Sequence, residues 1–286
     1  MKNNLFEIKY YETYYIANII KNVINDPFPY LINLNEFYGD GNECRLVQGF
    51  QKNSVFHQFI QFVIESLMDE EMNNVSISER LEMEKKYNIG FHDINYRELP
   101  IEEALKYYSI PHESFSEWIQ FNNIKFEDVT PDDISDYYFE LCEDEVYILS
   151  EKMASEVFYI LFMNRYLLGK FNELVASVIS NISLEDDFLR LEEKKHFKRD
   201  GVLHRKHIPQ WVKNAIFFRD RGRCVLCNKD LSKLLSLQNY KNFDHIVPLA
   251  LGGMNDVSNI QLLCSKCNLE KHDGASLTSI LYEKWF

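Results

Sequence analysis

Four cysteines near the C-terminus form two Cys-x-x-Cys pairs, Cys224/Cys227 and Cys264/Cys267. Two such pairs supply four thiolates, the ligand set of a tetrahedral structural zinc ion. The 36 residues between the pairs make a longer insert than that of a simple zinc ribbon, so we expect a further element there. The alternative interpretation is a group of buried free thiols.

The insert and the second cysteine pair carry an ordered series of polar residues. It begins with Asp-His in a short apolar stretch, continues with a Gly-Gly turn and an Asn before a second apolar stretch, and ends in Cys-x-x-Cys-Asn-x-x-Lys. The residues are Asp244, His245, Gly252, Gly253, Asn259, Cys264, Cys267, Asn268 and Lys271. From about residue 205 to residue 274 the sequence resembles the HNH endonucleases. The resemblance covers roughly a quarter of the chain and says nothing about residues 1–193.

The resemblance implies a ββα-metal fold, often clamped by a zinc ion on four cysteines. It also implies a metal-dependent endonuclease that hydrolyses DNA phosphodiester bonds. In-line attack by water would leave a 5′-phosphate and a 3′-hydroxyl.

Each polar residue suits one part of that reaction. His245 suits the general base, because a neutral imidazole takes up a proton near pH 7. Asp244 and Asn268 offer hard oxygen ligands for catalytic Mg²⁺. The family role of Asn259 is to hold the loop and orient the base. Asn268 stands where the family often has His, which gives an HNN-like variant and favours Mg²⁺, with Mn²⁺ as an alternative, over softer metals.

A plain structural alternative exists for each of these residues. Asp244 could cap or pair with an arginine, His245 could be structural, Asn259 could serve only a turn, and Asn268 could cap a helix. A geometric question also stays open. Adjacent residues of a flat strand face opposite sides, so Asp244 and His245 share one phosphate only if the strand bends there.

Phosphate binding is expected from basic residues around this motif. Lys271, His272 and Arg223 are the candidates for contacts to the substrate, with a solvated helix face as the alternative for Lys271 and His272. The basic stretch from Lys194 to Lys206 either contacts phosphates or is a solvated linker.

Charge divides the 286-residue chain into two unlike parts. Residues 1–193 hold 15 Lys and Arg against 36 Asp and Glu, a net charge of −21, whereas residues 194–286 hold 16 against 8, a net charge of +8. A chance fluctuation is the alternative to a domain boundary. We predict an acidic helical domain over residues 1–195 and a nuclease domain over residues 196–286, whose basic surface suits nucleic acid.

Helical periodicity dominates the acidic part. Helices are expected over Tyr10–Ile24, Val55–Met68, Ser76–Tyr87, Pro100–Tyr107 and Ser114–Phe121, with a further helix beginning at Thr130-Pro131, a long one over Glu151–Ser180 and a charged one over Asp186–Lys195. A helix opening at Pro209 should bury Trp211, Val212, Ala215, Ile216 and Phe218. The predicted fold class is therefore α+β, a mostly helical domain followed by a small zinc-bound ββα-metal domain.

The residues together predict an HNH endonuclease acting on DNA. A phage-defence or restriction-type effector is the expected biological role, with a protein partner binding the acidic helical domain. The alternative is a catalytically silent, zinc-stabilised module that binds nucleic acid or another partner. The chain starts without an apolar leader, and its longest apolar run, Val157–Met163, is too short to span a membrane, so we expect a cytoplasmic protein.

Overall fold

The computed structural model describes residues 12–39, 43–87, 97–185, 189–232 and 242–280, which form two compact units. The helical unit consists of Met1–Thr13 and Gln61–Glu156, and the mixed unit consists of Tyr14–Ile60 and Val157–Phe286. The helical unit holds 9 Lys and Arg against 26 Asp and Glu, a net charge of −17, and the mixed unit holds 22 against 18, a net charge of +4. The two units do not follow the expected boundary after residue 195. That residues 1–195 and 196–286 are separate domains stays a prediction.

The helical unit is built from short helices with strong start signals. Ser114 caps one helix by accepting a hydrogen bond from the Glu117 backbone N–H, and Thr130 caps another in the same way through Asp133. Both starts match those expected. The helices are α5 (Ile77–Tyr87), α6 (Pro100–Tyr107), α7 (Phe115–Phe121), η2 (Phe126–Asp128) and α8 (Pro131–Cys142). Two longer helices, α4 (Val55–Asn73) and α9 (Glu145–Leu161), continue from this unit into the other.

The helices of the mixed unit correct two expectations. The continuous helix expected over Glu151–Ser180 is wrong, because α9 ends at Leu161 and a new helix starts after Asn164, whose side chain accepts a hydrogen bond from the Leu167 N–H at 2.9 Å. The charged helix expected over Asp186–Lys195 is limited to Leu191–Lys194, and residues 186–188 lie outside the described part. The helices are α1 (Thr13–Asn25), η1 (Phe28–Tyr30), α2 (Leu31–Tyr38), α3 (Glu43–Val47), α10 (Arg165–Ile179), α11 (Leu191–Lys194) and α12 (Gln210–Arg219).

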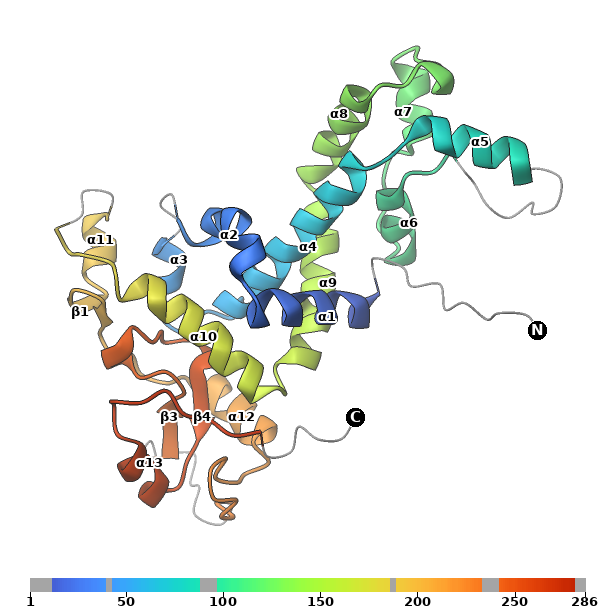
Figure 1. The fold of residues 1–286 in the computed structure, drawn as a ribbon. Coiled ribbons are helices and arrows are strands. Elements are labelled where there is room, and N and C mark those ends of the chain that lie inside the picture. Colours follow the sequence, from blue (N-terminus) through green and yellow to red (C-terminus); the bar gives the residue numbers. More distant parts are fainter. Residues whose placement is uncertain (1–11, 40–42, 88–96, 186–188, 233–241, 281–286) are drawn as a thin grey trace. The chain divides into compact units, whose positions relative to one another are not determined.

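Two small antiparallel sheets give the mixed unit its α+β character and confirm the predicted fold class. The first is a hairpin of β1 (Phe197–Arg199) and β2 (Val202–Leu203). The second pairs β3 (Phe243–His245) with β4 (Ile260–Leu262), so that Asp244 lies opposite Gln261. The remaining elements are η4 (Leu249–Leu251), η5 (Val257–Asn259) and α13 (Ser265–Lys271). Figure 1 shows β3, β4 and α13 close together, with α10 and α12 beside them.

A buried ion network joins α10 and α12 to β4. The Asp220 carboxylate accepts two hydrogen bonds from the Arg219 guanidinium, at 2.8 and 3.1 Å, and lies 3.5 Å from Arg165. It also accepts a bond from the Leu262 N–H, while Arg219 donates to the Ile260 carbonyl. Because these side chains are almost fully buried, losing one partner would leave an uncompensated charge, so the network fixes β4 against the two helices.

The segment that precedes α4 is bound to the part of the chain between β3 and β4. The Phe50 N–H donates to the Asn255 carbonyl at 2.7 Å, and the Val55 N–H at the start of α4 donates to the Asp256 carboxylate at 2.9 Å. Asp256 is buried, and its other oxygen accepts two bonds from Ser258. Residues distant in sequence therefore support the segment between β3 and β4. Among the described residues, no helix has the length and apolarity needed to cross a membrane.

Candidate active site

The four cysteines of the two pairs converge at one point. Their sulfur atoms all lie within 4.8 Å of one another, and the Sγ atoms of Cys227 and Cys264 are 3.7 Å apart. Zinc–sulfur bonds of about 2.3 Å in a tetrahedron place sulfurs about 3.8 Å apart, so the cluster has the geometry to hold a zinc ion. The expected metal-ligating role of these cysteines thus fits the structure.

The thiols influence one another's protonation. Burial raises the pKa of Cys264, but hydrogen bonds from the Cys267 backbone and from the neighbouring thiols lower it to about 7. Burial and the same neighbours raise the pKa of Cys267. The four thiols therefore do not all ionise at neutral pH without a cation, and a divalent metal would stabilise all four thiolates.

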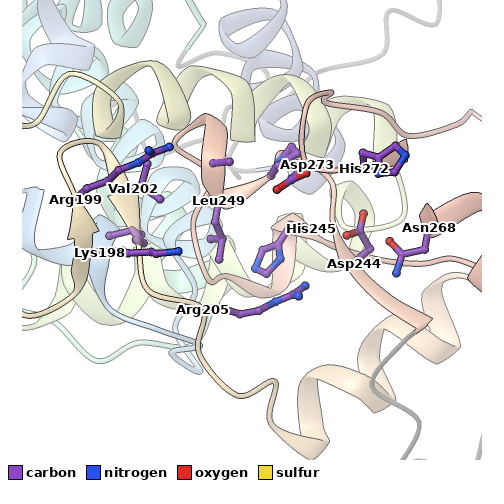
Figure 2. Close-up of a pocket in the computed structure, with 13 residues that line it drawn as sticks. Lys198, Arg199, Val202, Arg205, Asp244, His245, Leu249, Asn268, His272 and Asp273 are labelled. Carbon is purple, nitrogen blue, oxygen red and sulfur yellow. The ribbon is translucent and has the colours of Figure 1, made fainter. Parts of the chain in front are cut away.

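The second cysteine pair begins α13 and so places Asn268. Cys264 is the N-cap of this helix, and its sulfur accepts a hydrogen bond from the Cys267 N–H. Asn268 is consequently inside the helix, which excludes the helix-cap alternative. Across from it, β3 presents Asp244, and the two side chains point toward one another in Figure 2.

Asp244, His245 and Asn268 line one cavity of about 560 Å³. The two neighbouring strand residues both line this cavity, and His245 is the last residue of β3 before the chain turns toward Pro248. No irregularity of pairing marks a bend between Asp244 and His245, which lie in register opposite Gln261 and Ile260. Figure 2 shows the His245 ring on one side of Asp244 and the Asn268 side chain on the other.

Asn259 holds the turn that follows His245. Its amide oxygen accepts a hydrogen bond from the Val247 N–H at 2.8 Å, and its amide nitrogen donates to the carbonyls of Val247 and Met254 at 3.0 and 2.9 Å. Its backbone carbonyl accepts a further bond from Ile246. The side chain is fully buried and is not among the cavity-lining residues, so its role is to fix the loop rather than to touch a ligand.

The Gly-Gly turn lets this loop approach α10 closely. Gly252 has φ of 83°, and a Cβ there would meet the Ala176 carbonyl oxygen at 2.5 Å. A Cβ on Gly253 would collide with the Val247 carbonyl oxygen. Both positions therefore require glycine, which explains the dipeptide in the motif.

His245 is neutral at physiological pH in this site. Its pKa is lowered to about 3, mainly by burial and also by the nearby charges of Arg205 and Lys271, while a hydrogen bond with Asn255 opposes this shift. Its Nε2 atom is buried and has no hydrogen-bond partner within the described ranges. Such an orphaned nitrogen is suited to accept a proton from a bound water or to bond a ligand.

The β1–β2 hairpin contributes the basic wall of the cavity. Lys198 and Arg199 come from β1, and Arg205 follows β2, with its guanidinium reaching toward His245 in Figure 2. All three are exposed, and none forms a salt bridge in the part of the chain that the structure describes. The hairpin turn is held because Gly201, at φ of 64°, lies against Ser180 at the end of α10. Part of the basic stretch is therefore a structured wall and not a free linker.

Two of the other residues expected to bind phosphate lie elsewhere. Lys271 is buried, and its ammonium nitrogen is 2.9 Å from the Asp244 carboxylate. Arg223 donates to the Asn228 carbonyl at the first cysteine pair and does not line the cavity. Asp244 therefore forms an ion pair with a lysine. The structural alternative for this residue had been a pair with an arginine.

Sequence reasoning missed two contributions to the cavity. The hairpin could have been found from Asp200-Gly201, a dipeptide typical of tight hairpin turns, between two short strands. Asp273, just after α13, also lines the cavity but carries no motif that would identify it. His272, which the sequence offers as a candidate phosphate contact, lines the cavity one residue earlier.

Comparison with known families agrees with this geometry. The model of the HNH endonuclease family matches residues 224–274, so the chain carries an HNH domain in its C-terminal region. No family model matches the N-terminal part. No curated protein and no solved structure matches the chain.

Proposed function

We propose that the protein is a metal-dependent endonuclease that hydrolyses DNA phosphodiester bonds in the cavity between β3, α13 and the β1–β2 hairpin. The observation that carries the proposal is the convergence there of an imidazole with a free Nε2, two hard oxygen donors and three basic side chains that form no salt bridge within the described residues. The match of residues 224–274 to the HNH family supports the same reaction class. Phosphodiester hydrolysis needs a base, charge neutralisation and a bound phosphate, and the cavity contains a candidate for each.

His245 is the proposed general base. A neutral ring with a free Nε2 takes the proton of the attacking water, and Asn259 keeps the loop after it in place. A phosphate bound beside Arg205 brings negative charge close to the ring and raises the low pKa of His245 toward neutrality. Substrate binding thereby makes the base stronger.

The basic wall is the proposed phosphate-binding surface. Lys198, Arg199 and Arg205 bind phosphate oxygens without reading base sequence, so they position the strand over His245. Arg223 lies outside this cavity, and its expected phosphate contact stays a prediction for DNA that extends toward the cysteine cluster.

Asp244 and Asn268 fit a magnesium ion, because carboxylate and amide oxygens are the donors that this cation prefers and the two side chains point toward one another. A Mg²⁺ ion held by these residues would neutralise charge on the scissile phosphate and on the leaving oxygen. Mn²⁺ suits the same donors.

Cleavage of supercoiled plasmid by the wild type and by His245→Ala, with and without Mg²⁺, tests the proposal. We expect the variant to lose about 10²–10⁴-fold in rate, since general base catalysis contributes that much. DNA binding measured without added Mg²⁺ should stay unchanged, because it rests on the basic wall. His112→Ala, in the helical unit, is the matched control and should cut like the wild type.

Two results would contradict the proposal. Absence of metal-dependent cleavage of plasmid, single-stranded DNA and RNA by the zinc-loaded wild type would favour the catalytically silent module. A His245→Ala variant within a few-fold of the wild-type rate would mean that another group is the base. End-labelled products should carry a 5′-phosphate.

The helical unit is the part of the chain where we expect a protein partner. Its net charge of −17 disfavours DNA by long-range repulsion and favours a basic protein surface. A role in phage defence follows from this expectation alone and stays a prediction.

A further inference from the structure

Lys271 contacts both residues at the end of β3 from inside the protein. Its ammonium group donates a hydrogen bond to the His245 backbone carbonyl at 2.7 Å and lies 2.9 Å from Oδ2 of Asp244. The lysine side chain is 1% exposed. The contact to Asp244 is an ion pair and not an aligned hydrogen bond, because Oδ2 has no partner that meets hydrogen-bond geometry.

The ion pair distinguishes the two oxygens of the Asp244 carboxylate. Oδ2 is buried against Lys271, whereas the Asp244 side chain as a whole is 15% exposed and lines the cavity. Oδ1 is therefore the oxygen able to reach an ion or ligand in the cavity. Without Lys271 the carboxylate could turn about its χ2 angle, whose rotamers are broad, and present either oxygen.

The second contact acts on the backbone. The carbonyl of His245 closes β3, where the strand stops and the chain turns toward Pro248. A charged donor on this carbonyl fixes the peptide that carries the His245 side chain. One buried ammonium group thus restrains both the carboxylate and the base.

We propose that Lys271 is a positioning residue that fixes Asp244 and His245 relative to each other, and that it does not bind the substrate phosphate. The proposal rests on the endonuclease function proposed above. Burial carries it, because a side chain that is 1% exposed and engaged with two internal oxygens has no path to a DNA backbone.

Lys271→Met tests the proposal, since methionine has a similar length and lacks the charge and the donors. Partners of a metal ligand typically contribute about 10–100-fold to metal affinity or activity, so we expect kcat to fall by that factor. KM and the dissociation constant for DNA should stay within twofold. A phosphate contact would instead weaken DNA binding and reduce the slope of log K against log salt by about 0.9.

Lys266→Met is the matched control on the same helix. Lys266 is 82% exposed and pairs only loosely with Glu270, at 3.7 Å. It should leave kcat and DNA affinity unchanged. Lys271→Arg keeps the charge and donors and should recover part of kcat. Zinc content and melting temperature, measured for every variant, identify a change that acts only through folding.

Amine acylation of the full wild-type chain, read by mass spectrometry, tests the proposal even if Lys271→Met fails to fold. Lys271 should resist labelling with and without a DNA duplex in buffer without added Mg²⁺, while Lys266 is labelled in both. Labelling of Lys271 in the free protein that DNA suppresses would overturn the proposal. So would a Lys271→Met variant with normal kcat. Because labelling needs no cleavage, an inactive wild type would contradict the endonuclease and leave this test intact.

Discussion

The cysteine cluster and the neighbouring cavity both offer metal-type ligands and both depend on α13, but they are assembled differently. The cluster brings four sulfurs within 4.8 Å of one another from two short pairs. The cavity gathers Asp244 from β3, Asn268 from α13 and basic residues from the β1–β2 hairpin, which lies outside the matched HNH region. The cysteine cluster is a closed site with soft sulfur ligands, whereas the cavity is an open site with hard oxygen ligands.

The local sequence alone can build the cysteine cluster but not the cavity. A Cys-x-x-Cys pair directs two ligands to one ion through its own turn, so two pairs complete the cluster. The cavity needs supports from distant segments, including Asn259, the Asp220 network and the Phe50–Asn255 contact. We therefore expect loss of zinc to remove both sites, whereas damage to the supports of the cavity should spare the cluster.

The largest effect is expected from Cys264→Ser. Structural zinc contributes about 10–16 kcal/mol of apparent binding energy in small domains, so losing one ligand should unfold the part of the chain built on β4. Because residues 14–60 and 157–195 belong to the same compact unit, they should lose structure as well. Elemental analysis and limited proteolysis measure zinc and folding.

Cys142→Ser is the control for this variant, because Cys142 is a half-buried cysteine outside the cluster. It should keep its zinc. Folded wild-type protein that contains no zinc would show that the cysteine cluster is not a metal site. The contrast between a zinc site and the neighbouring cavity would then be wrong.

The next effect is expected from Asn259→Ala, which removes three hydrogen bonds to the loop after His245. At about 1 kcal/mol for each bond, the free energy of unfolding should fall by about 3 kcal/mol. Cleavage should fall too, while zinc content stays at the wild-type level. Urea unfolding, with the exposed Asn214→Ala as control, measures the loss. An unchanged midpoint would mean that the loop is held by other contacts.

Elements whose short sequence pattern determines their own geometry were predicted correctly. Pro100–Tyr107 was expected with the bounds that α6 has, and the cysteine pairs and the Gly-Gly turn were found by spacing. The prediction for α12 located the helix but not all of its buried side, since Phe218 is 77% exposed and Lys213 is buried. Helical periodicity gives the position of an element but not which neighbour covers each face.

Features that depend on distant partners were not predictable in this way. An apolar run through residues 157–163 gave no sign of the break before Asn164, because the cap there is a single polar residue. Lys271 was expected to contact phosphate, but it is buried, because the end of β3 supplies two oxygens that balance its ammonium group. Those oxygens come close to Lys271 only in the folded chain, where the end of β3 lies beside α13.

The smallest effect is expected from single residues of the basic wall. Arg205→Ala should reduce the slope of log K against log salt by about 0.9, the value for one phosphate contact, and should leave zinc content and stability unchanged. Arg205 lines the cavity, is exposed and forms no salt bridge in the described ranges, so its substitution removes charge without disturbing packing.

Arg223→Ala is the informative comparison, because Arg223 lies at the cysteine cluster and donates a hydrogen bond to the Asn228 carbonyl. If DNA follows the cavity alone, only Arg205→Ala changes the slope in fluorescence anisotropy titrations between 50 and 200 mM salt, a range of about fourfold over which such slopes are measurable. Equal changes for both variants would mean that bound DNA spans both regions, and a change for Arg223→Ala alone would place the phosphate path at the cluster and contradict the proposed wall.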